Sequence, residues 1–501
     1  MADPLANTTA IVSATPAAAA WVARPAPPTR VSRAVTPVVR ARYDAAQYSD
    51  ENRRHWANVD GLSARAANSA DVRYRLRTRA RYESANNSYA RGIVLTLAND
   101  TIGTGPRLQL LTDDNEVNRA VEKAFMRWSD VIGLADKLRV MRQSRAVDGE
   151  AFALLTSNDR LDSEVQLDIK IIEADQVTTP DLVPSDINAI DGIRFDGQGN
   201  PIEYHVLRTH PGDIYPLLWA YDRIPARSVI HWFRADRPGQ ARGIPDITPA
   251  LPLFAQLRRY TLAVLAAAET AADFAAVLYS DMPPNGEADP AEPFESLEIT
   301  PRMMTTLPSG WKMGQFEAAQ PTTTYAQFKA EILNEIARCL NMPFNVAAGN
   351  SSGYNYSSGR LDHQVYYKSL RVDQSQAELV VLDRIFAAWL DEFSLVSDVL
   401  PAGPAQLGGW PHQWFWDGQE HVDPQKEATA QETRLRNHTT TLADEYARRG
   451  QDWEVQIRQR AKELELMTEL GLSVSTAPTA AMQPVTPEPD DGGSNADTED
   501  A

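Results

Sequence analysis

The residues with the most obvious chemical potential form a G-x-S-x-G sequence, Gly349-Asn350-Ser351-Ser352-Gly353. In serine hydrolases this spacing places a serine at a strained strand-to-helix turn, beside backbone N–H groups that stabilise an oxyanion. Ser351 would be the nucleophile, with Asp373 or Asp383 and then His412 following in Ser, Asp, His order. The alternative is that these residues belong to a flexible loop that projects from the fold.

The flanking sequence favours the loop. A helix is predicted from about Tyr325 to Leu340, and Pro343 ends it. Only Phe344 to Ala348 could form the strand that an elbow needs, and it is short. The chain then stays polar, and the next helix is not expected before Ser357 or Ser358. A polar loop between two amphipathic helices is therefore our prediction, and the hydrolase is the alternative.

Two acidic pairs, Asp148-Gly149-Glu150 and Glu173-Ala174-Asp175, could form a two-carboxylate site. Nothing in the sequence places a histidine, lysine or metal beside them, so we interpret them as turn and strand-end residues. The 8 histidines show no metal-binding spacing, and one cysteine cannot build a zinc site. The chain has no G-x-x-x-x-G-K-[ST] loop, so any ATP-driven motor would be a partner. No metal or cofactor is predicted.

Composition narrows the classes of protein. The 501 residues suffice for several domains, and the single cysteine, Cys339, excludes an intramolecular disulfide framework and is expected to be packed and unreactive. A net charge of -18 argues against tight wrapping of nucleic acid by a basic surface. The sequence has no stretch of about 18 apolar residues that would suggest a membrane span.

The two ends of the chain have opposite charge. Residues 1–42 contain one acid and five arginines, whereas residues 463–501 contain nine acids and no lysine or arginine. Both ends are rich in Pro, Thr and small residues, which cannot bury enough apolar surface to offset chain entropy. We predict disordered tails over 1–42 and 477–501.

The first half of the chain reads as an α+β domain. A helix is predicted from Asp71 without a break to Gly103, and another after Asp114. The arginines alternating from Arg73 to Arg81 are interpreted as a solvated or subunit-facing surface, with a phosphate-binding face as the alternative. Strands are predicted at Ala151–Thr156, Val165–Ile172, Ile193–Phe195, Ile202–Leu207 and Val229–Phe233.

The second half is predicted to be mainly helical. An alanine-rich helix is expected from Leu251 to Leu278, followed by a small insert with short strands such as Met303–Leu307 and Trp311–Phe316. After the polar loop, a long helix is expected from about Arg360 to Phe393, and its expected apolar stripe consists of Leu379, Leu382, Phe386, Trp389, Leu390 and Phe393. Helices starting at Asp423-Pro424 should fill the rest, with Gly450 and Gly471 as C-caps.

The order of these parts resembles the lambda-type portal proteins of tailed double-stranded DNA phages, over about residues 43–475. The resemblance rests on segments in this order: RARYESANNSYARGIVLTLANDTIGTG at 79–105, AVDGEAFALL at 146–155, DGQGNPIEYHVLR at 196–208, RADRPGQARGIPDITPAL at 234–251, NYSSGR at 355–360 and WFWDGQEHVDPQKEATAQETRLRNHTTTLADEYARRGQDWE at 414–454. A scaffold or capsid shell protein would not explain the order of helix, insert, helix and loop.

The resemblance implies an α+β portal fold that assembles into a dodecameric ring at one capsid vertex. DNA would enter through this ring during packaging and leave through it at ejection. The implied domains are a wing at 43–245, stem helices at 246–278 and 321–342, a clip at 279–320, a tunnel loop at 343–360, a long wing helix at 361–400 and a helical crown at 401–476.

Site and partners also follow from the resemblance. The implied residues of the DNA-facing tunnel loop are Asn350, Ser351, Ser352, Tyr354, Asn355 and Tyr356. The implied partners are further copies of the chain, the large terminase subunit, a head-tail adaptor, the major capsid protein or scaffold, and passing double-stranded DNA, with no membrane. The protein would be structural and not an enzyme, located in the virion and, during assembly, in the host cytoplasm. An acidic conduit would let DNA slide without gripping its phosphates.

Overall fold

The computed structural model describes residues 53–179, 188–213, 220–272, 276–280, 311–315, 324–353, 355–400, 410–418 and 424–472. The chain divides into two compact units, Met1–Gly61 and Leu62–Ala501. In the first unit only residues 53–61 are described, and they contain a turn; every described helix and strand belongs to the second. The predicted disordered tails and the predicted strand at Met303–Leu307 lie outside the described residues.

The predicted helix from Asp71 to Gly103 is two helices. After the short α1 (Ala64–Ala67), α2 (Ala70–Asn86) ends and α3 (Ser88–Ile102) begins on either side of Asn87. Asn87 has extended backbone angles, and its side chain accepts the N–H groups of Tyr89 and Ala90. The apolar periodicity is continuous through this segment, but the capping side chain of Asn87 ends one helix and starts the next.

A first core forms around aromatic side chains. Helix α4 (Asn115–Ile132) follows Asp114 as predicted, with the Asp114 side chain as its N-cap, and α5 (Leu134–Asp148) comes next. Strand β1 (Arg107–Leu110) pairs antiparallel with β11 (His412–Phe415). Residues 412–415 are thus a strand in a region expected to be helical. Residues from α4, the long helix described below and β11 meet in this core: Phe125, Trp128, Phe386, Trp389 and Trp414.

Two antiparallel sheets follow, and all five predicted strands are confirmed. The first has the order β3 (Leu167–Ile172), β2 (Glu150–Ser157), β8 (Val229–Phe233). The second has the order β4 (Ala189–Ile190), β5 (Ile193–Phe195), β6 (Pro201–Leu207), β7 (Tyr221–Pro225). Asp196 accepts the N–H groups of Gln198 and Asn200 in the turn between β5 and β6. Short 3-10 turns lie at Ala174–Gln176, Ala226–Ser228 and Thr248–Ala250.

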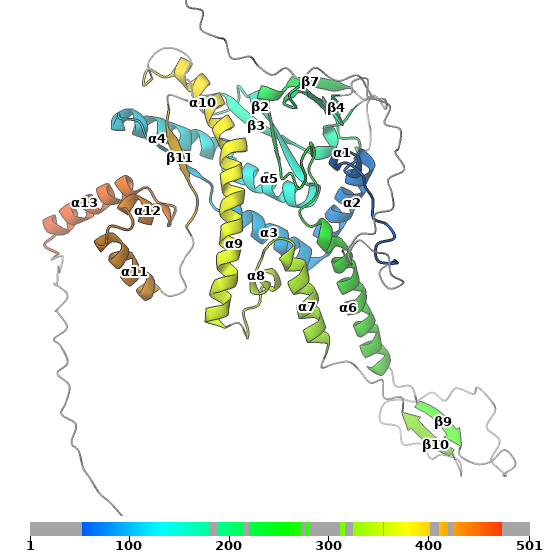
Figure 1. Cartoon of the computed structure of the whole chain (residues 1–501). Helices are drawn as coiled ribbons and strands as arrows, with labels where there is room; N and C mark the ends of the chain where they lie inside the picture. The colour runs from blue at the N-terminus through cyan, green and yellow to red at the C-terminus, as the bar shows by residue number, and fades with distance from the viewer. Residues whose placement is uncertain are drawn as a thin grey trace, which may run out of the picture. The chain divides into compact units, whose positions relative to one another are not determined.

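Helices α6 (Leu251–Ala272) and α7 (Tyr325–Arg338) lie side by side (Figure 1). Tyr260 packs on Tyr325 and Phe328 with ring centroids 5.7 and 4.4 Å apart. The expected continuation of α6 to Leu278 is wrong, because 276–280 form β9 (Ala276–Ser280). This strand pairs antiparallel with β10 (Trp311–Gln315), which confirms the strand predicted there.

The polar loop is shorter than predicted. Residues Phe344–Ala348 form a helical turn, α8, and not a strand, because Pro343 starts the turn and Gly349 closes it at φ 63°. Helix α9 (Tyr356–Ala377) begins before Ser357, so the loop spans residues 349–355. The predicted loop of 343–360 therefore contains helical turns at both of its ends.

The predicted long helix is interrupted by a π segment. Helix α9 continues into a π turn at Glu378–Leu382 and then into α10 (Asp383–Val396). The wider turn shifts the helical phase, so Leu379, which was expected in the apolar stripe, is 71% exposed. The other expected stripe residues are buried: Leu382, Phe386, Trp389, Leu390 and Phe393.

Three helices form the C-terminal part: α11 (Pro424–Arg436), α12 (Leu442–Ala447) and α13 (Trp453–Glu469). The start at Pro424 is confirmed, and Gly450 and Gly471 have the positive φ angles expected after helix ends. Arg434 of α11 pairs with Glu445 of α12 at 2.8 Å. Among the described helices, none is long and apolar enough to cross a membrane.

Candidate functional site

The loop between α8 and α9 presents polar side chains to solvent. Asn350, Ser351, Ser352 and Asn355 are exposed. The N–H of Asn350 donates to the carbonyl of Asn345, and Asn350 in turn accepts the N–H of Ser352 at 2.9 Å. Tyr354 and the side chain of Tyr356 lie outside the described part of the chain. The structure thus places four of the six predicted loop residues together on one exposed turn.

The hydrolase constellation is not assembled. The Ser351 hydroxyl accepts a long hydrogen bond from Asn345 at 3.5 Å, and a helical turn precedes it where an elbow needs a strand. His412 does lie 3.2 Å from Asp383, but its other ring nitrogen contacts the carbonyl oxygen of Trp410. Asp373, the other proposed acid, accepts hydrogen bonds from arginines of α5.

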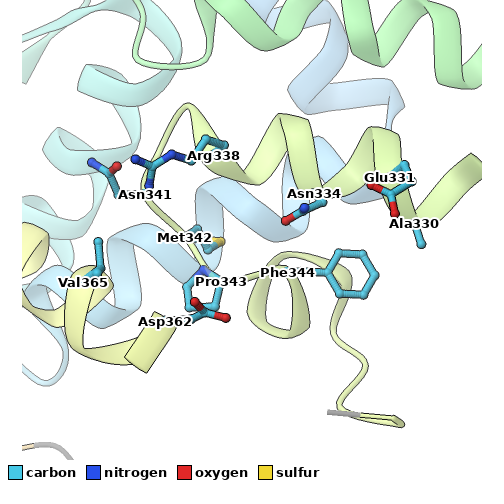
Figure 2. Close-up of a pocket in the computed structure, with 10 residues that line it drawn as sticks. All are labelled: Ala330, Glu331, Asn334, Arg338, Asn341, Met342, Pro343, Phe344, Asp362 and Val365. Atoms are coloured by element: carbon cyan, nitrogen blue, oxygen red, sulfur yellow. The ribbon is translucent and has the colours of Figure 1, made fainter. Parts of the chain in front are cut away.

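A groove of about 460 Å³ lies beside the start of the loop. Figure 2 shows side chains from α7, the α7–α8 turn and α9 around it. Its charged lining residues are Glu331 and Arg338 from α7 and Asp362 from α9. Because the lining is open and mixed in charge, the groove is better suited to a protein side chain or helix than to an enclosed small ligand.

A buried ion network is centred on Glu150 of β2. This carboxylate accepts hydrogen bonds from Arg242 and Arg77, each at 2.7 Å, and lies 3.0 Å from His231. Burial alone would raise the pKa of Glu150, but Arg242, His231 and Arg77 outweigh it and hold that pKa well below the usual range. Gly243 permits the approach, because a Cβ there would lie 1.9 Å from the carbonyl oxygen of Gly149.

This network corrects the interpretation of the alternating arginines. Arg73 and Arg77 are 2% and 4% exposed, and neither lies on a solvated face. Arg73 pairs with Asp191, and burial followed by the nearby charge of Arg242 lowers the pKa of Arg73 to about 10. Arg75 is exposed as predicted. The inward arginines are four residues apart, which is the spacing of one helix face.

The two acidic pairs are also not isolated. They do sit at element ends, as expected, but arginines lie beside them. Arg81 contacts Asp148 at 2.6 Å and Asp175 at 2.7 Å. Glu173, Asp175 and His210 form the one group among the described residues whose atoms could together hold a metal ion. Arg77 and Arg81 already contact Asp175, so this carboxylate has cationic partners without an ion.

A second buried ion cluster joins three elements. Arg142 of α5 contacts Asp246, just before α6, at 3.0 Å and Asp373 of α9 at 2.9 Å. Arg145 contacts Asp373 at 2.8 Å. Burial raises the pKa of Asp373, but the arginines outweigh it and lower that pKa overall. The segment entering α6 and the helix that follows the polar loop are therefore fastened to the same two side chains.

Comparison with known proteins decides the family. Residues 51–374 match the model of the phage portal proteins of the lambda family. The chain belongs to that family. A curated relative, the probable portal protein of Halomonas phage phiHAP-1, is 28% identical over 429 residues, covering 79% of this chain and 81% of its own.

Solved structures with similar chains come from gene transfer agent particles. For a chain of the native virion the identity is 12% and the TM-score 0.41, covering 72% of this chain and 88% of that one. A chain in the neck of the empty particle, computed with C6 symmetry, has an identity of 13% and a TM-score of 0.42, and the match covers 71% of this chain and 87% of that one. A chain in the neck of the native particle, computed with C12 symmetry, has an identity of 14% and a TM-score of 0.42, and the match covers 74% of this chain and 90% of that one.

Ser351 lies in an exposed loop after a helical turn, and we predict that it is not a nucleophile. We expect Ser351→Ala to leave assembly and any esterase signal of the purified portal protein unchanged, because within the described chain the Ser351 hydroxyl contacts the amide of Asn345 and not a base. A fluorophosphonate probe and a native mass measurement on both proteins check this. Labelling that is present in the wild type and lost in Ser351→Ala would contradict it.

The buried His231 should make the portal chain acid-sensitive. It stacks between Phe152 and Phe233, with centroids 4.2 and 4.5 Å away. Burial lowers its pKa below 6.5, although Glu150 opposes the shift. The unfolded chain therefore takes up a proton first as pH falls, and stability present above about pH 6.5 is lost below it.

Replacing His231 should make the free energy of unfolding less dependent on pH in the acid range. We expect His231→Gln to reduce the slope of unfolding free energy between about pH 6.5 and 5 by up to about 1.4 kcal/mol per pH unit. Glu150 acts at lower pH, because its unfolded pKa is 4.5. Urea unfolding across this range measures the slope, with the exposed His55→Gln as control. Equal slopes in all three proteins would exclude His231 as the cause.

Proposed function

We propose that twelve copies of this portal chain form a ring at one vertex of a phage capsid, and that the genome passes through the ring. Family membership over residues 51–374 carries the proposal, and the subunit number comes from the family resemblance. Packaging would place the large terminase subunit on this ring, and a head-tail adaptor would replace it later. The major capsid protein or scaffold would surround the ring in the assembling head and the virion.

The described helices and strands can be assigned to the wing, stem, clip and crown of the portal fold. The two sheets with α2–α5, the long helix α9–α10 and β11 would form the wing, and α6 and α7 the stem. Strands β9 and β10 would belong to the clip, whose start then moves from 279 to 276, and α11–α13 would belong to the crown. Placing β11 with the wing is supported by its pairing with β1, which moves the start of the crown to α11.

The loop of residues 349–355 would line the channel. Asn350, Ser351, Ser352 and Asn355 are polar and uncharged, and Tyr354 and Tyr356 would complete the lining. Side chains of this kind can touch a duplex without forming the charge-assisted phosphate contacts that give tight, salt-dependent binding. Together with the net charge of -18, this composition supports a conduit in which DNA slides.

Label position in the assembled ring tests this function. In a Cys339→Ala background, Ser352→Cys rings would be reacted with a gold-maleimide label and viewed end-on in negative stain. The expected result is rings of about twelve copies, taken from the family resemblance, with gold at the central hole. Lys123→Cys on the exposed face of α4 is the matched control and should label the periphery. Purified protein that stays monomeric, or gold at the rim for Ser352→Cys, would overturn the proposal.

A further inference from the structure

The stem hairpin of α6 and α7 leaves one face of α6 uncovered. Four exposed residues spaced i, i+3, i+4 and i+7 form this face, which we call the α6 row: Arg259, Leu262, Ala263 and Ala266. Leu262 is 56% exposed, and the surface around Arg259 and Ala263 is hollowed. Within the described residues, Arg259 forms no ion pair. The side chains of the row are apolar and mostly small, except for the cation Arg259 at its N-terminal end.

A second uncovered face lies on α7. Glu331, Asn334, Glu335 and Arg338 have the same spacing and are all exposed. Three of them line the groove of Figure 2, whose other wall is α9 with Asp362 and Val365. Helix α9 adds an exposed apolar stripe, Leu361, Val365 and Val372, at 64%, 53% and 64%. We call this surface the α7–α9 groove; Glu331 forms no ion pair within the described chain.

The two faces match in height. Tyr260 packs directly on Tyr325 and Phe328, so these rings mark one level of the hairpin. Arg259 is one residue from Tyr260, and Glu331 is three residues from Phe328, or about 1.5 and 4.5 Å along the helix axes. An arginine side chain spans such an offset. In a ring the copies are related by rotation alone, so for stem helices that run along the ring axis, groups at one level of the hairpin lie at one height in every copy and can meet across the interface.

We propose that in the ring the α6 row of one copy lies in the α7–α9 groove of the next, with Arg259 paired to Glu331 of that copy. The inference rests on the proposed ring and specifies its stem contact. Leu262 and Ala263 would cover the apolar wall formed by Leu361 and Val365. Such a head-to-tail contact uses two different surfaces of one chain, and it closes only as a ring.

Complementarity favours a second copy as the occupant over another protein. One chain carries both the exposed cation and the exposed acid, each beside apolar surface and each without an ion-pair partner in the described chain. A different protein bound to the α6 row would leave the α7–α9 groove open. A second copy covers both faces at every position of the ring, so no apolar wall stays exposed.

Charge reversal tests the pairing. Arg259→Glu and Glu331→Arg should each raise the concentration for half-assembly at least about tenfold, because like charges then face each other. The double variant restores opposite charges and should assemble within about threefold of wild type. Lys123→Glu on α4 is the control for reversal at an exposed position. Native mass spectrometry across a dilution series gives the assembled fraction.

Cysteine cross-linking tests the geometry independently. In a Cys339→Ala background, Arg259→Cys combined with Glu331→Cys should give, with a short bis-maleimide cross-linker, a ladder of covalent multimers that reaches the full ring, because the two backbones of an Arg–Glu pair are too far apart for a direct disulfide. Either single-cysteine variant should give dimers at most. If wild type forms rings but the reversals have no effect and no ladder appears, this inference is wrong and the proposed function stands. If wild type forms no ring, the proposed function itself fails.

Discussion

Replacing Glu150 by glutamine is expected to lower the free energy of unfolding by about 3–5 kcal/mol. Glu150 is fully buried, and its carboxylate accepts hydrogen bonds from Arg242, Arg77 and the backbone N–H of Gly243. The neutral amide would remove the anion that Arg242 and Arg77 share, which leaves Arg242 with Asp191 and Arg77 with Asp175 as their remaining carboxylates. The low-dielectric interior magnifies that loss. Urea unfolding of the wild type and the variant, followed by tryptophan fluorescence, measures the change.

A surface pair provides the matched control. Glu432 and Arg436 lie four residues apart on α11 and are both exposed, so Glu432→Gln should leave the unfolding midpoint where it is. Arg242→Met should behave like Glu150→Gln, because it breaks the same network from the cationic side. Midpoints shifted equally by Glu432→Gln and Glu150→Gln would show that the buried network has no special role in stability.

This network marks where sequence patterns stop being informative. Alternation from Arg73 to Arg81 describes a local row of charges, and charge rows are usually solvated. Whether such a row is buried depends on carboxylates such as Glu150 and Asp191, which the fold brings from more than 70 residues away. The one available signal was the resemblance itself, because the quoted segments at 146–155 and 234–251 contain Glu150 and Arg242.

Elements with a strong local pattern were predicted well. The five strands, α4 and α7 have clear periodicity and recognisable ends, and their bounds agree with the structure to within a few residues. The pair of β1 and β11 was missed, because each strand has four residues and its partner lies about 300 positions away. Long-range pairing of short strands leaves no trace in a local window.

The loop that carries the candidate site residues was predicted in outline. Gly349 to Gly353 is a loop with exposed polar side chains, as the flanking helices indicated. The length of the loop was overestimated. The five residues Phe344–Ala348 are too few to show a helical period, but they form a helical turn between Pro343 and Gly349. The π segment of the long helix was likewise invisible, since it is stabilised by tertiary contacts such as Glu378 with Trp416.

Introducing leucine at Ala267 of α6 is expected to abolish ring assembly without unfolding the chain. Ala267 is exposed in the single chain and follows Ala263 by one helical turn, at the edge of the α6 row. A closely packed neighbour would have to accommodate the larger side chain at about 1–3 kcal/mol per interface. In a closed ring the penalty recurs at every contact. Ala271 is also in α6, but its side chain lies outside the described residues, so Ala271→Leu is the weaker test.

Circular dichroism and native mass, measured on the same preparation, separate assembly from folding. Leucine forms helix nearly as well as alanine, so helicity should be unchanged while the ring is lost or altered in size. Ala428→Leu, at an exposed position of α11, controls for added apolar surface. Intact rings in Ala267→Leu and Ala271→Leu would mean that these alanines face solvent in the assembly. The assignment of α6 to the stem would then fail, because a helix that lines a ring wall cannot accept leucine there without displacing its neighbour.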